Sequence, residues 1–243
     1  MKKLYTALLA SALALSVSNV FAHEHGAEDK IKAAMQSDVR SDAEKERDRN
    51  RRPVQTLAFF GLQDDMKVVE LLPGGGWYTK LLVPTLAENG EYYAAIGTGR
   101  VKERLADLPG FDKMNIVAEN ARLWREEGSR FYSMELGSLG VTDADMVLTF
   151  RNYHNFGDQG RAAMNKAAFD ALKSGGVYAV VDHTARHMEP MNYSNRRRFD
   201  PVKAIKEIQA AGFELVDYST LHYREDDELE YEVGARSVSG NTD

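Results

Sequence analysis

The sequence predicts an α/β protein with a doubly wound, mostly parallel sheet and helices on both of its faces. Short apolar runs typical of buried strands recur along the chain, at residues 67–72, 91–96, 145–150, 177–181 and 213–218. Segments with helical periodicity separate these runs, and such alternation is characteristic of a parallel sheet. A glycine cluster follows the first run directly, at the position where sheets of this kind contact ligands.

The composition narrows the class of protein. A chain of 243 residues that is 43% hydrophobic and 28% charged can bury a sizeable core and form one globular domain. The 31 Lys and Arg against 37 Asp and Glu give a net charge of −6, which argues against a nucleic-acid-binding protein. Because the chain has no cysteine, disulfides, zinc–thiolate sites, iron–sulfur clusters and thiol nucleophiles are excluded.

Residues 1–22 have the pattern of a secretory signal peptide. Met1-Lys2-Lys3 is basic, residues 4–20 are rich in Ala, Leu and Ser, and Val20-Phe21-Ala22 suits cleavage after Ala22. The apolar stretch is short for a membrane span, and no later run approaches that length. We therefore expect export to the periplasm, and no contact with a membrane after cleavage. The sequence does not specify an oligomeric state.

Two further parts follow the signal peptide. Residues 23–52 are predicted to form a charged N-terminal helical arm, with one exposed helix over 42–52, ahead of a domain over 53–243. The domain begins with a helix from Pro53 to Gly61, whose apolar face is expected to hold Leu57, Phe59 and Phe60.

The remaining helices are predicted by periodicity and by caps. They are expected over 77–86, 101–107, 158–172 and, after an Asp200-Pro201 start, up to 211. Residues 115–119 fit either a strand or the start of a helix through 125, and residues 130–134 fit a strand.

The glycine cluster is the most informative motif. Gly74-Gly75-Gly76 lies between a predicted strand and a predicted helix, where glycine lets the backbone turn tightly and approach a ligand. The N–H groups at the start of the helix can bind an anionic group. The Gly-Lys-Ser/Thr of a phosphate-binding P-loop is absent, and three adjacent glycines do not match a dinucleotide fingerprint.

Together with neighbouring residues, this loop resembles the first motif of the class I S-adenosylmethionine-dependent methyltransferases. Glu70, Gly74 and Gly76 match the acidic residue and two of the three alternating glycines, and Leu72 takes the place of the first glycine. The resemblance runs from about residue 53 to 218 and is closest to a family of secreted, predicted methyltransferases. Three segments carry it beyond the loop: Arg-Asn-Tyr-His-Asn at 151–155, Arg-Phe-Asp-Pro at 198–201 and Ala-Ala-Gly-Phe at 210–213.

The resemblance implies a Rossmann-like class I methyltransferase domain that binds S-adenosyl-L-methionine. Gly74, Gly75 and Gly76 would pass under the methionine part of the cofactor, and Glu70 would interact with its ammonium directly or through water. Other residues that the resemblance places in the cofactor site are Pro73, Tyr78, Thr79, Gly97, Arg151 and Asn152.

Two features depart from the family pattern. The second strand of the family normally ends in an acid that binds the ribose hydroxyls, whereas here residues 95–99 are Ala-Ile-Gly-Thr-Gly. Glu119 or Glu135 is left as a candidate contact to the adenine end. The family also closes its sheet with an antiparallel last strand; either residues 229–238 form it or the sequence stops short of it.

Polar residues follow the predicted strands at 145–150 and 177–181. His154 and His183 come directly after these strands, and Tyr153 and Asp182 share that edge of the sheet. We predict His154, Tyr153 and His183 as catalytic residues, because a histidine with a near-neutral pKa suits removal of a proton from a methyl acceptor. The alternative is that these polar residues only cap strand ends.

A metal site is a rival interpretation of the same edge. Asp182, His154, His183 and His187 are a nitrogen and oxygen ligand set, although no known metal-binding spacing is matched. The basic run at 196–198 could bind an anionic substrate or be simply solvated.

The sequence therefore predicts a periplasmic S-adenosylmethionine-dependent methyltransferase with a small-molecule substrate. Two alternatives stay open: a secreted, non-catalytic ligand-binding relative of that fold, and a metal-dependent enzyme that uses His154, His183 and His187. The non-catalytic alternative is supported by the fact that S-adenosylmethionine is made in the cytoplasm, so a periplasmic enzyme would need the cofactor to be exported.

Overall fold

The computed structural model describes residues 26–190, 192, 195, 197–227 and 229. The predicted signal peptide lies outside these residues, as does all but Leu229 of the candidate last strand at 229–238. Among the described residues, no helix combines the length and the apolar character that crossing a membrane requires.

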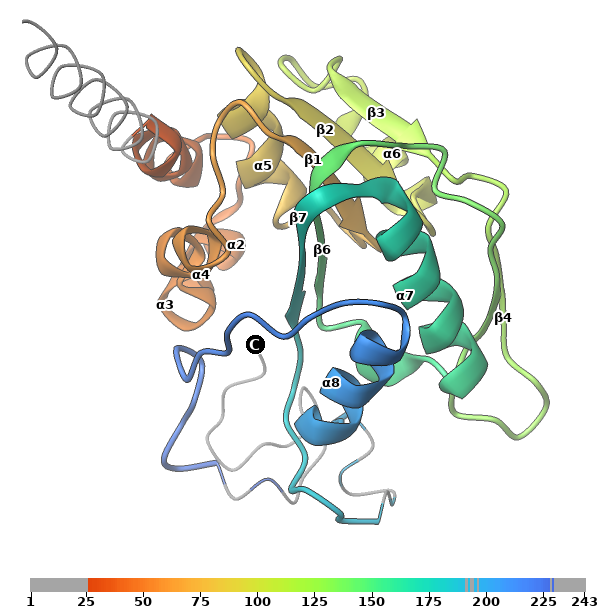
Figure 1. The fold of residues 1–243 in the computed structure, drawn as a ribbon. Coiled ribbons are helices and arrows are strands. Elements are labelled where there is room, and N and C mark those ends of the chain that lie inside the picture. Colours follow the sequence, from red (N-terminus) through yellow and green to blue (C-terminus); the bar gives the residue numbers. More distant parts are fainter. Residues whose placement is uncertain (1–25, 191, 193–194, 196, 228, 230–243) are drawn as a thin grey trace, which may run out of the picture.

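The centre of the molecule is a sheet of five parallel strands in the order β3-β2-β1-β6-β7 (Figure 1). These strands are β1 (Lys67–Leu71), β2 (Glu91–Ala95), β3 (Met114–Val117), β6 (Ala144–Phe150) and β7 (Leu172–Val181). The chain runs outward from β1 to β3 and then returns to pair β6 beside β1. The doubly wound sheet predicted from the sequence is thus confirmed, with its switch point between β1 and β6.

Helices cover both faces of this sheet (Figure 1). One face packs against α4 (Pro53–Phe59), α5 (Thr79–Leu86) and α6 (Gly99–Leu105), which contribute Leu57, Leu81 and Leu105 to one apolar cluster. The other face packs against α7 (Asp158–Ala171) and α8 (Pro201–Ala210), and its cluster includes Met164 of α7. Helix α8 begins as predicted, with the Asp200 side chain accepting from the N–H groups of Val202 and Lys203.

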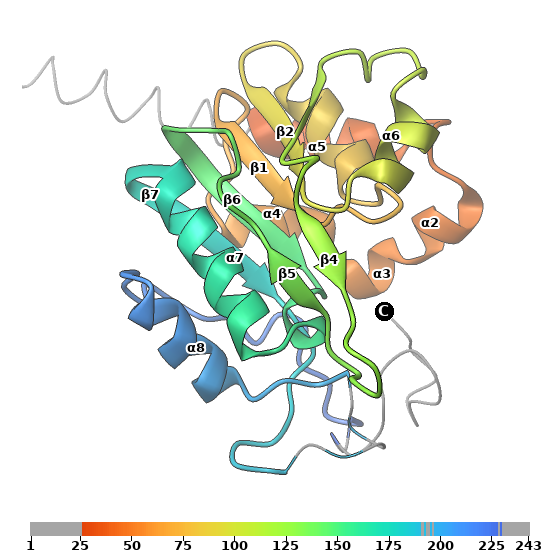
Figure 2. The same cartoon turned by 90° about the vertical axis from the view of Figure 1, so that its right-hand side faces the viewer.

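A second, smaller sheet lies outside the central one. Its strands β4 (Arg122–Trp124) and β5 (Ser133–Glu135) are antiparallel (Figure 2). The strand predicted at 130–134 is therefore shifted to β5, whereas the ambiguous segment near 115–119 is strand β3 of the central sheet.

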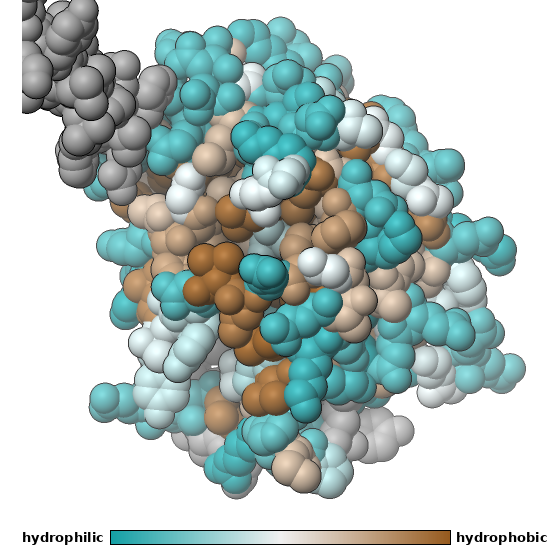
Figure 3. Space-filling view, viewed as in Figure 1, coloured by the Kyte–Doolittle hydropathy of each residue, from teal (hydrophilic) through white to brown (hydrophobic). Residues whose placement is uncertain are grey.

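The strand predicted at 213–218 is wrong. This segment has no regular secondary structure and pairs with no strand among the described residues. Phe213 packs against Phe169 and Tyr178, with ring centroids 5.2 Å away in both cases, while Val216 is 94% exposed. An apolar run becomes a strand only where a neighbouring strand supplies hydrogen bonds. Leu215 and Tyr218 are also exposed. Apolar residues gather near α4 on the face of the molecule that Figure 3 shows.

The N-terminal segment differs from the predicted single exposed helix over 42–52. Residues 26–35 are helical, and two short helices follow, α2 (Asp42–Glu46) and α3 (Asp48–Arg51), which meet at Arg47. Ser41 and Glu44 form a capping box at the start of α2. In α4, Leu57 is buried as predicted but Phe59 is 41% exposed, because it lies off the helix face that carries Leu57 and Phe60.

Candidate functional site

The glycine loop connects β1 to α5 at the carboxyl end of the sheet. Gly74 and Gly76 have φ of 59° and 86°, and the Gly76 N–H donates to the Pro73 carbonyl over 3.0 Å to close the turn. A Cβ on Gly76 would lie 2.6 Å from Leu105 of α6, whereas a Cβ on Gly74 would meet no atom within 4 Å. Gly76 is thus required for packing, and Gly74 leaves one side of the loop open to a ligand.

Glu70 lies beneath this loop, and its carboxyl group is buried. The Tyr92 hydroxyl and the Thr79 hydroxyl donate to the same carboxyl oxygen, Oε2, over 2.6 and 2.7 Å. Burial raises the pKa of Glu70 to about 7, although these two hydrogen bonds oppose the shift. Two predicted cofactor residues, Glu70 and Thr79, therefore bond to each other inside the protein.

Sequence reasoning missed Tyr92. Its backbone lies opposite Val68 in the parallel pair of β1 and β2. Side chains alternate along a strand, so Tyr92 shares a sheet face with Val68 and Glu70. The alternation of the two strands was the only available signal.

Tyr78 is buried against the end of β6. Its ring stacks on Phe150 with centroids 3.5 Å apart and planes at 8°, and it meets Trp77 edge-on at 4.7 Å. Pro73 is also buried. Pro73 and Tyr78, both predicted to contact the cofactor, are therefore packed in the protein interior at the two ends of the loop.

The loop after β6 is hydrogen-bonded to the start of the glycine loop. The Asn152 amide donates to the Leu72 carbonyl and to the Thr149 hydroxyl, both over 3.2 Å. Arg151 has a φ of 62°, and its N–H donates to Val181 of β7 over 2.7 Å. The carboxyl ends of β1, β6 and β7 thus form one connected region, as expected at a switch point.

His154 and Asp182 form a pair in this region. The His154 ring nitrogen Nδ1 lies 2.5 Å from Asp182 Oδ1, and the His154 backbone N–H donates to Oδ2 over 2.9 Å. Burial raises the pKa of the Asp182 carboxyl, but the bonds from His154 outweigh it and hold that pKa below its ordinary value. The carboxylate is therefore charged at neutral pH.

His183 lies next to this pair. Its ring centroid is 5.8 Å from that of His154, and its backbone N–H donates to Asp182 Oδ1 over 2.7 Å. Burial lowers the pKa of His183 to about 4, despite the nearby Asp182 carboxylate. The structure thus brings His154 and His183 together, as predicted, with His183 neutral.

Tyr153 does not join them. Its hydroxyl donates to Glu207 of α8 and accepts from Asn165 of α7, both over 2.9 Å, and its ring is buried against Phe199. The predicted catalytic role of Tyr153 is therefore replaced by a structural one, because neighbouring residues in a 3₁₀ turn point in different directions.

The structure does not assemble the rival metal site. His187 is 54% exposed and bonds to Asp200 over 2.8 Å instead of approaching His154 and His183. Within the part of the chain that the structure describes, no group of three or more His, Asp or Glu side chains is placed to hold a metal ion. In the basic run, Arg198 is buried and paired with Asp227 over 2.7 Å, and Arg196 lies outside the described residues.

The end of β2 has no acidic side chain at the position where the methyltransferase pattern has a carboxylate, so only backbone groups are present there. Ile96 and Gly97 have φ of 64° and 63°, and a Cβ on Gly97 would touch Leu72 and Leu123. Glu119 pairs with Lys102 over 2.8 Å and Glu135 lies 4.0 Å from Arg122, all with exposed side chains. Both candidates for the adenine end are therefore engaged in surface ion pairs.

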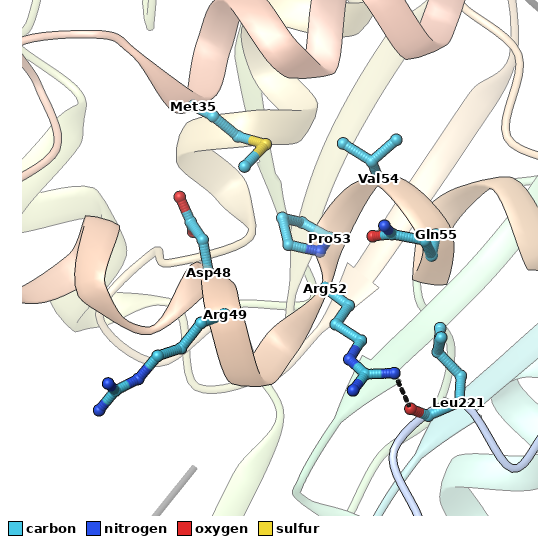
Figure 4. Close-up of a pocket in the computed structure, with 8 residues that line it drawn as sticks. All are labelled: Met35, Asp48, Arg49, Arg52, Pro53, Val54, Gln55 and Leu221. Carbon is cyan, nitrogen blue, oxygen red and sulfur yellow. Dashed lines mark hydrogen bonds between the residues drawn. The ribbon is translucent and has the colours of Figure 1, made fainter.

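Two cavities lie away from the glycine loop. The larger, of about 490 Å³, lies between the N-terminal helices and the C-terminal segment (Figure 4), and its lining includes Met35, Asp48, Pro53, Val54 and Leu221. Arg52 Nη1 crosses to the Leu221 carbonyl over 2.9 Å. The smaller, of about 180 Å³, lies beside α8 and is lined in part by Arg198, Phe199 and Lys203.

Comparison with known proteins adds the fold family. No family model and no curated protein matches the chain. An S-adenosylmethionine-dependent methyltransferase from Aquifex aeolicus superposes with a TM-score of 0.52 at 17% identity, covering 77% of this chain and 88% of that one. A predicted O-methyltransferase from Nostoc punctiforme superposes with a TM-score of 0.50 at 18% identity, covering 70% of this chain and 52% of that one. The chain has the class I methyltransferase fold.

In this methyltransferase fold, the glycine loop, the end of β2 and the loop after β6 occupy the carboxyl edge of the sheet, where ligands bind. The chain spans about half the length of the Nostoc protein. At these identities the likeness extends to the fold alone, and activity has to be argued from the site.

Proposed function

We propose that this protein is an S-adenosylmethionine-dependent methyltransferase that acts on a small molecule in the periplasm, with His154 as its general base. The observation that carries the proposal is the His154–Asp182 pair. His154 lies in the turn after β6, the strand beside β1, and Asp182 directly follows β7. The hydrogen bond from Asn152 to Leu72 holds the two loops together. A base and a cofactor loop at one edge of a sheet are what methyl transfer to a hydroxyl requires.

The residues of the loop fit such a cofactor at its methionine end. Gly74 is open on the side where a Cβ would stand, and Gly75 is only partly covered. When bound, S-adenosylmethionine supplies a methyl group on a sulfonium. At the ribose end, Gly97 and Thr98 offer backbone groups and no carboxylate.

His154 would take the proton of the acceptor hydroxyl. The Asp182 carboxylate accepts the Nδ1–H of a neutral His154 ring, which leaves the lone pair on Nε2. The same carboxylate stabilises the imidazolium that forms when Nε2 takes the proton. His183 is neutral at pH 7 and is available to hydrogen-bond the acceptor.

A second candidate function is a secreted binding protein with no catalysis. The end of β2 favours it, because a site without a ribose-binding carboxylate binds the cofactor less tightly or takes another ligand.

Calorimetric titration with S-adenosylhomocysteine separates the candidates. We expect saturable binding, and no binding at millimolar ligand would overturn both the cofactor and the methyltransferase proposal. With tritiated S-adenosylmethionine and a periplasmic small-molecule extract, His154→Gln should lower methyl transfer roughly 10²- to 10⁴-fold, the usual contribution of a general base. Binding of S-adenosylhomocysteine should be unchanged. His187→Gln removes an exposed histidine and is the matched control.

The periplasmic location rests on the signal-peptide pattern of residues 1–22. We expect the protein recovered from the periplasm to begin at His23 on N-terminal sequencing. An intact Met1 on protein confined to the cytoplasm would contradict this location and leave the chemistry of the site unaffected.

A further inference from the structure

Trp77, the residue directly after the glycine cluster, is enclosed by the N-terminal segment. The guanidinium groups of Arg40 and Arg51 lie over its ring, 4.9 and 4.4 Å from the centroid. Its indole N–H donates to the Glu44 carbonyl over 3.1 Å, and only 8% of the residue is exposed. Stacked guanidinium groups attract the face of an indole ring, and the attraction is strongest where water is excluded.

Hydrogen bonds and ion pairs connect the residues around Trp77 to one another and to α5. Asp48 binds Arg40 through two hydrogen bonds of 2.9 and 2.5 Å, and the Arg40 side chain is fully buried. Glu44 also binds Lys80 of α5 over 2.8 Å. We call Arg40, Glu44, Asp48 and Arg51 the N-terminal clamp. It holds both the ring of Trp77 and the first turn of α5.

Trp77 also belongs to a row of aromatic rings that ends next to the loop carrying the candidate base. Trp77 meets Tyr78 edge-on at 4.7 Å, and Tyr78 stacks on Phe150. Phe150 is the last residue of β6, whose following loop carries His154. The rings of Trp77, Tyr78 and Phe150 therefore form a continuous row, with the clamp at one end and the loop after β6 at the other.

We propose that the N-terminal clamp positions the glycine loop for cofactor binding, with Arg51 and Arg40 as positioning residues. The loop between Pro73 and Trp77 contains two backbone positions with positive φ, at Gly74 and Gly76, and glycine there leaves the chain many other conformations. Fixing Trp77 at one end removes those conformations before the ligand arrives, so binding does not have to supply the cost of ordering. The inference rests on the proposed function, because it takes the cofactor to be the ligand of this loop.

The chain offers a matched pair of variants on α3. Arg51→Ala removes one guanidinium from Trp77, whereas Arg49→Ala removes a guanidinium that is 72% exposed and whose ion pair to Glu46 spans 3.4 Å. We expect Arg51→Ala to weaken binding of S-adenosylhomocysteine roughly three- to tenfold, which is the range of one partly desolvated cation–π contact. Arg49→Ala should bind as the wild type does. Arg51→Lys keeps a cation over the ring and should restore most of the affinity.

Hydrogen–deuterium exchange of the cofactor-free protein tests positioning independently of the ligand. The amides of residues 74–79 should exchange faster in Arg51→Ala than in Arg49→Ala, while those of β1 stay unchanged. Equal exchange in the two variants would overturn the proposal. If the wild type binds S-adenosylhomocysteine, equal affinity of the two variants despite unequal exchange would overturn it as well. If the wild type binds no S-adenosylhomocysteine but the exchange difference is present, the proposed function fails and the mechanical role of the clamp stands. A uniform rise in exchange across both sheet faces would show global destabilisation and would also count against positioning.

Discussion

At the scale of the residue, Glu70 shows how burial changes what a sequence motif means. The motif assigns this carboxyl to a cofactor ammonium, but in the folded chain its Oε2 accepts hydrogen bonds from Tyr92 and Thr79. Burial disfavours the charged form and raises the pKa to about 7. Glu70 is therefore part of the support of the glycine loop, and its protonation is coupled to folding.

This coupling predicts a pH dependence of stability. The folded protein binds the Glu70 proton more tightly than the unfolded chain, so the stabilisation is fully present below pH 4.5 and is lost as the pH rises to about 7. Glu70→Gln resembles the protonated form and should remove this loss. Between pH 5 and 7.5, the free energy of unfolding from urea titrations should fall by about 2 kcal/mol less in Glu70→Gln than in the wild type. The exposed Glu103→Gln is the control, and equal slopes in all three proteins would refute the assignment.

At the scale of the element, the turn from β1 to α5 depends on glycine for two separate reasons. Gly76 has a φ of 86° and also packs against Leu105 of α6. Gly110 has nearly the same φ, 85°, but a Cβ there would meet no atom within 4 Å. The two positions therefore share the backbone cost of a side chain and differ in the clash.

Alanine at the two positions should separate these costs. Gly110→Ala is expected to lower the free energy of unfolding by about 1–2 kcal/mol, the cost of a side chain in the left-handed region. Gly76→Ala should cost about 1–3 kcal/mol more, because the buried Leu105 side chain has to move. Urea unfolding of both variants measures the difference. Equal losses would mean that α6 adapts and that Gly76 is needed for its conformation alone.

At the scale of the whole molecule, side chains from segments far apart in the chain connect the helices on each face of the sheet. Arg161 of α7 is 1% exposed and binds Glu207 of α8 over 2.6 and 2.9 Å, and Glu207 also accepts from Tyr153. On the other face, the N-terminal clamp holds α5. The site at the carboxyl edge of the sheet is thus supported by residues on both faces, none of which belongs to the glycine motif.

Much of this arrangement could be predicted from the sequence, because it is local or periodic. The four runs at 67–72, 91–96, 145–150 and 177–181 are strands, as predicted. A short apolar run is a local feature, because it depends only on neighbouring residues. The proximity of His154 and His183 followed from their places after the ends of two neighbouring strands. The run at 213–218 has the same local character but pairs with no described strand.

By itself, the sequence determined the alternation of strands and helices, the glycine turn and the edge of the sheet where the histidines lie. Only the tertiary structure decided that the Tyr153 hydroxyl is hydrogen-bonded to Glu207 and that His187 is hydrogen-bonded to Asp200. It also decided that the N-terminal segment encloses Trp77. The physical reason is that a side chain's partners are set by segments far away in the chain. Hydrogen bonds and ring contacts form with whichever group packing brings within about 3–5 Å.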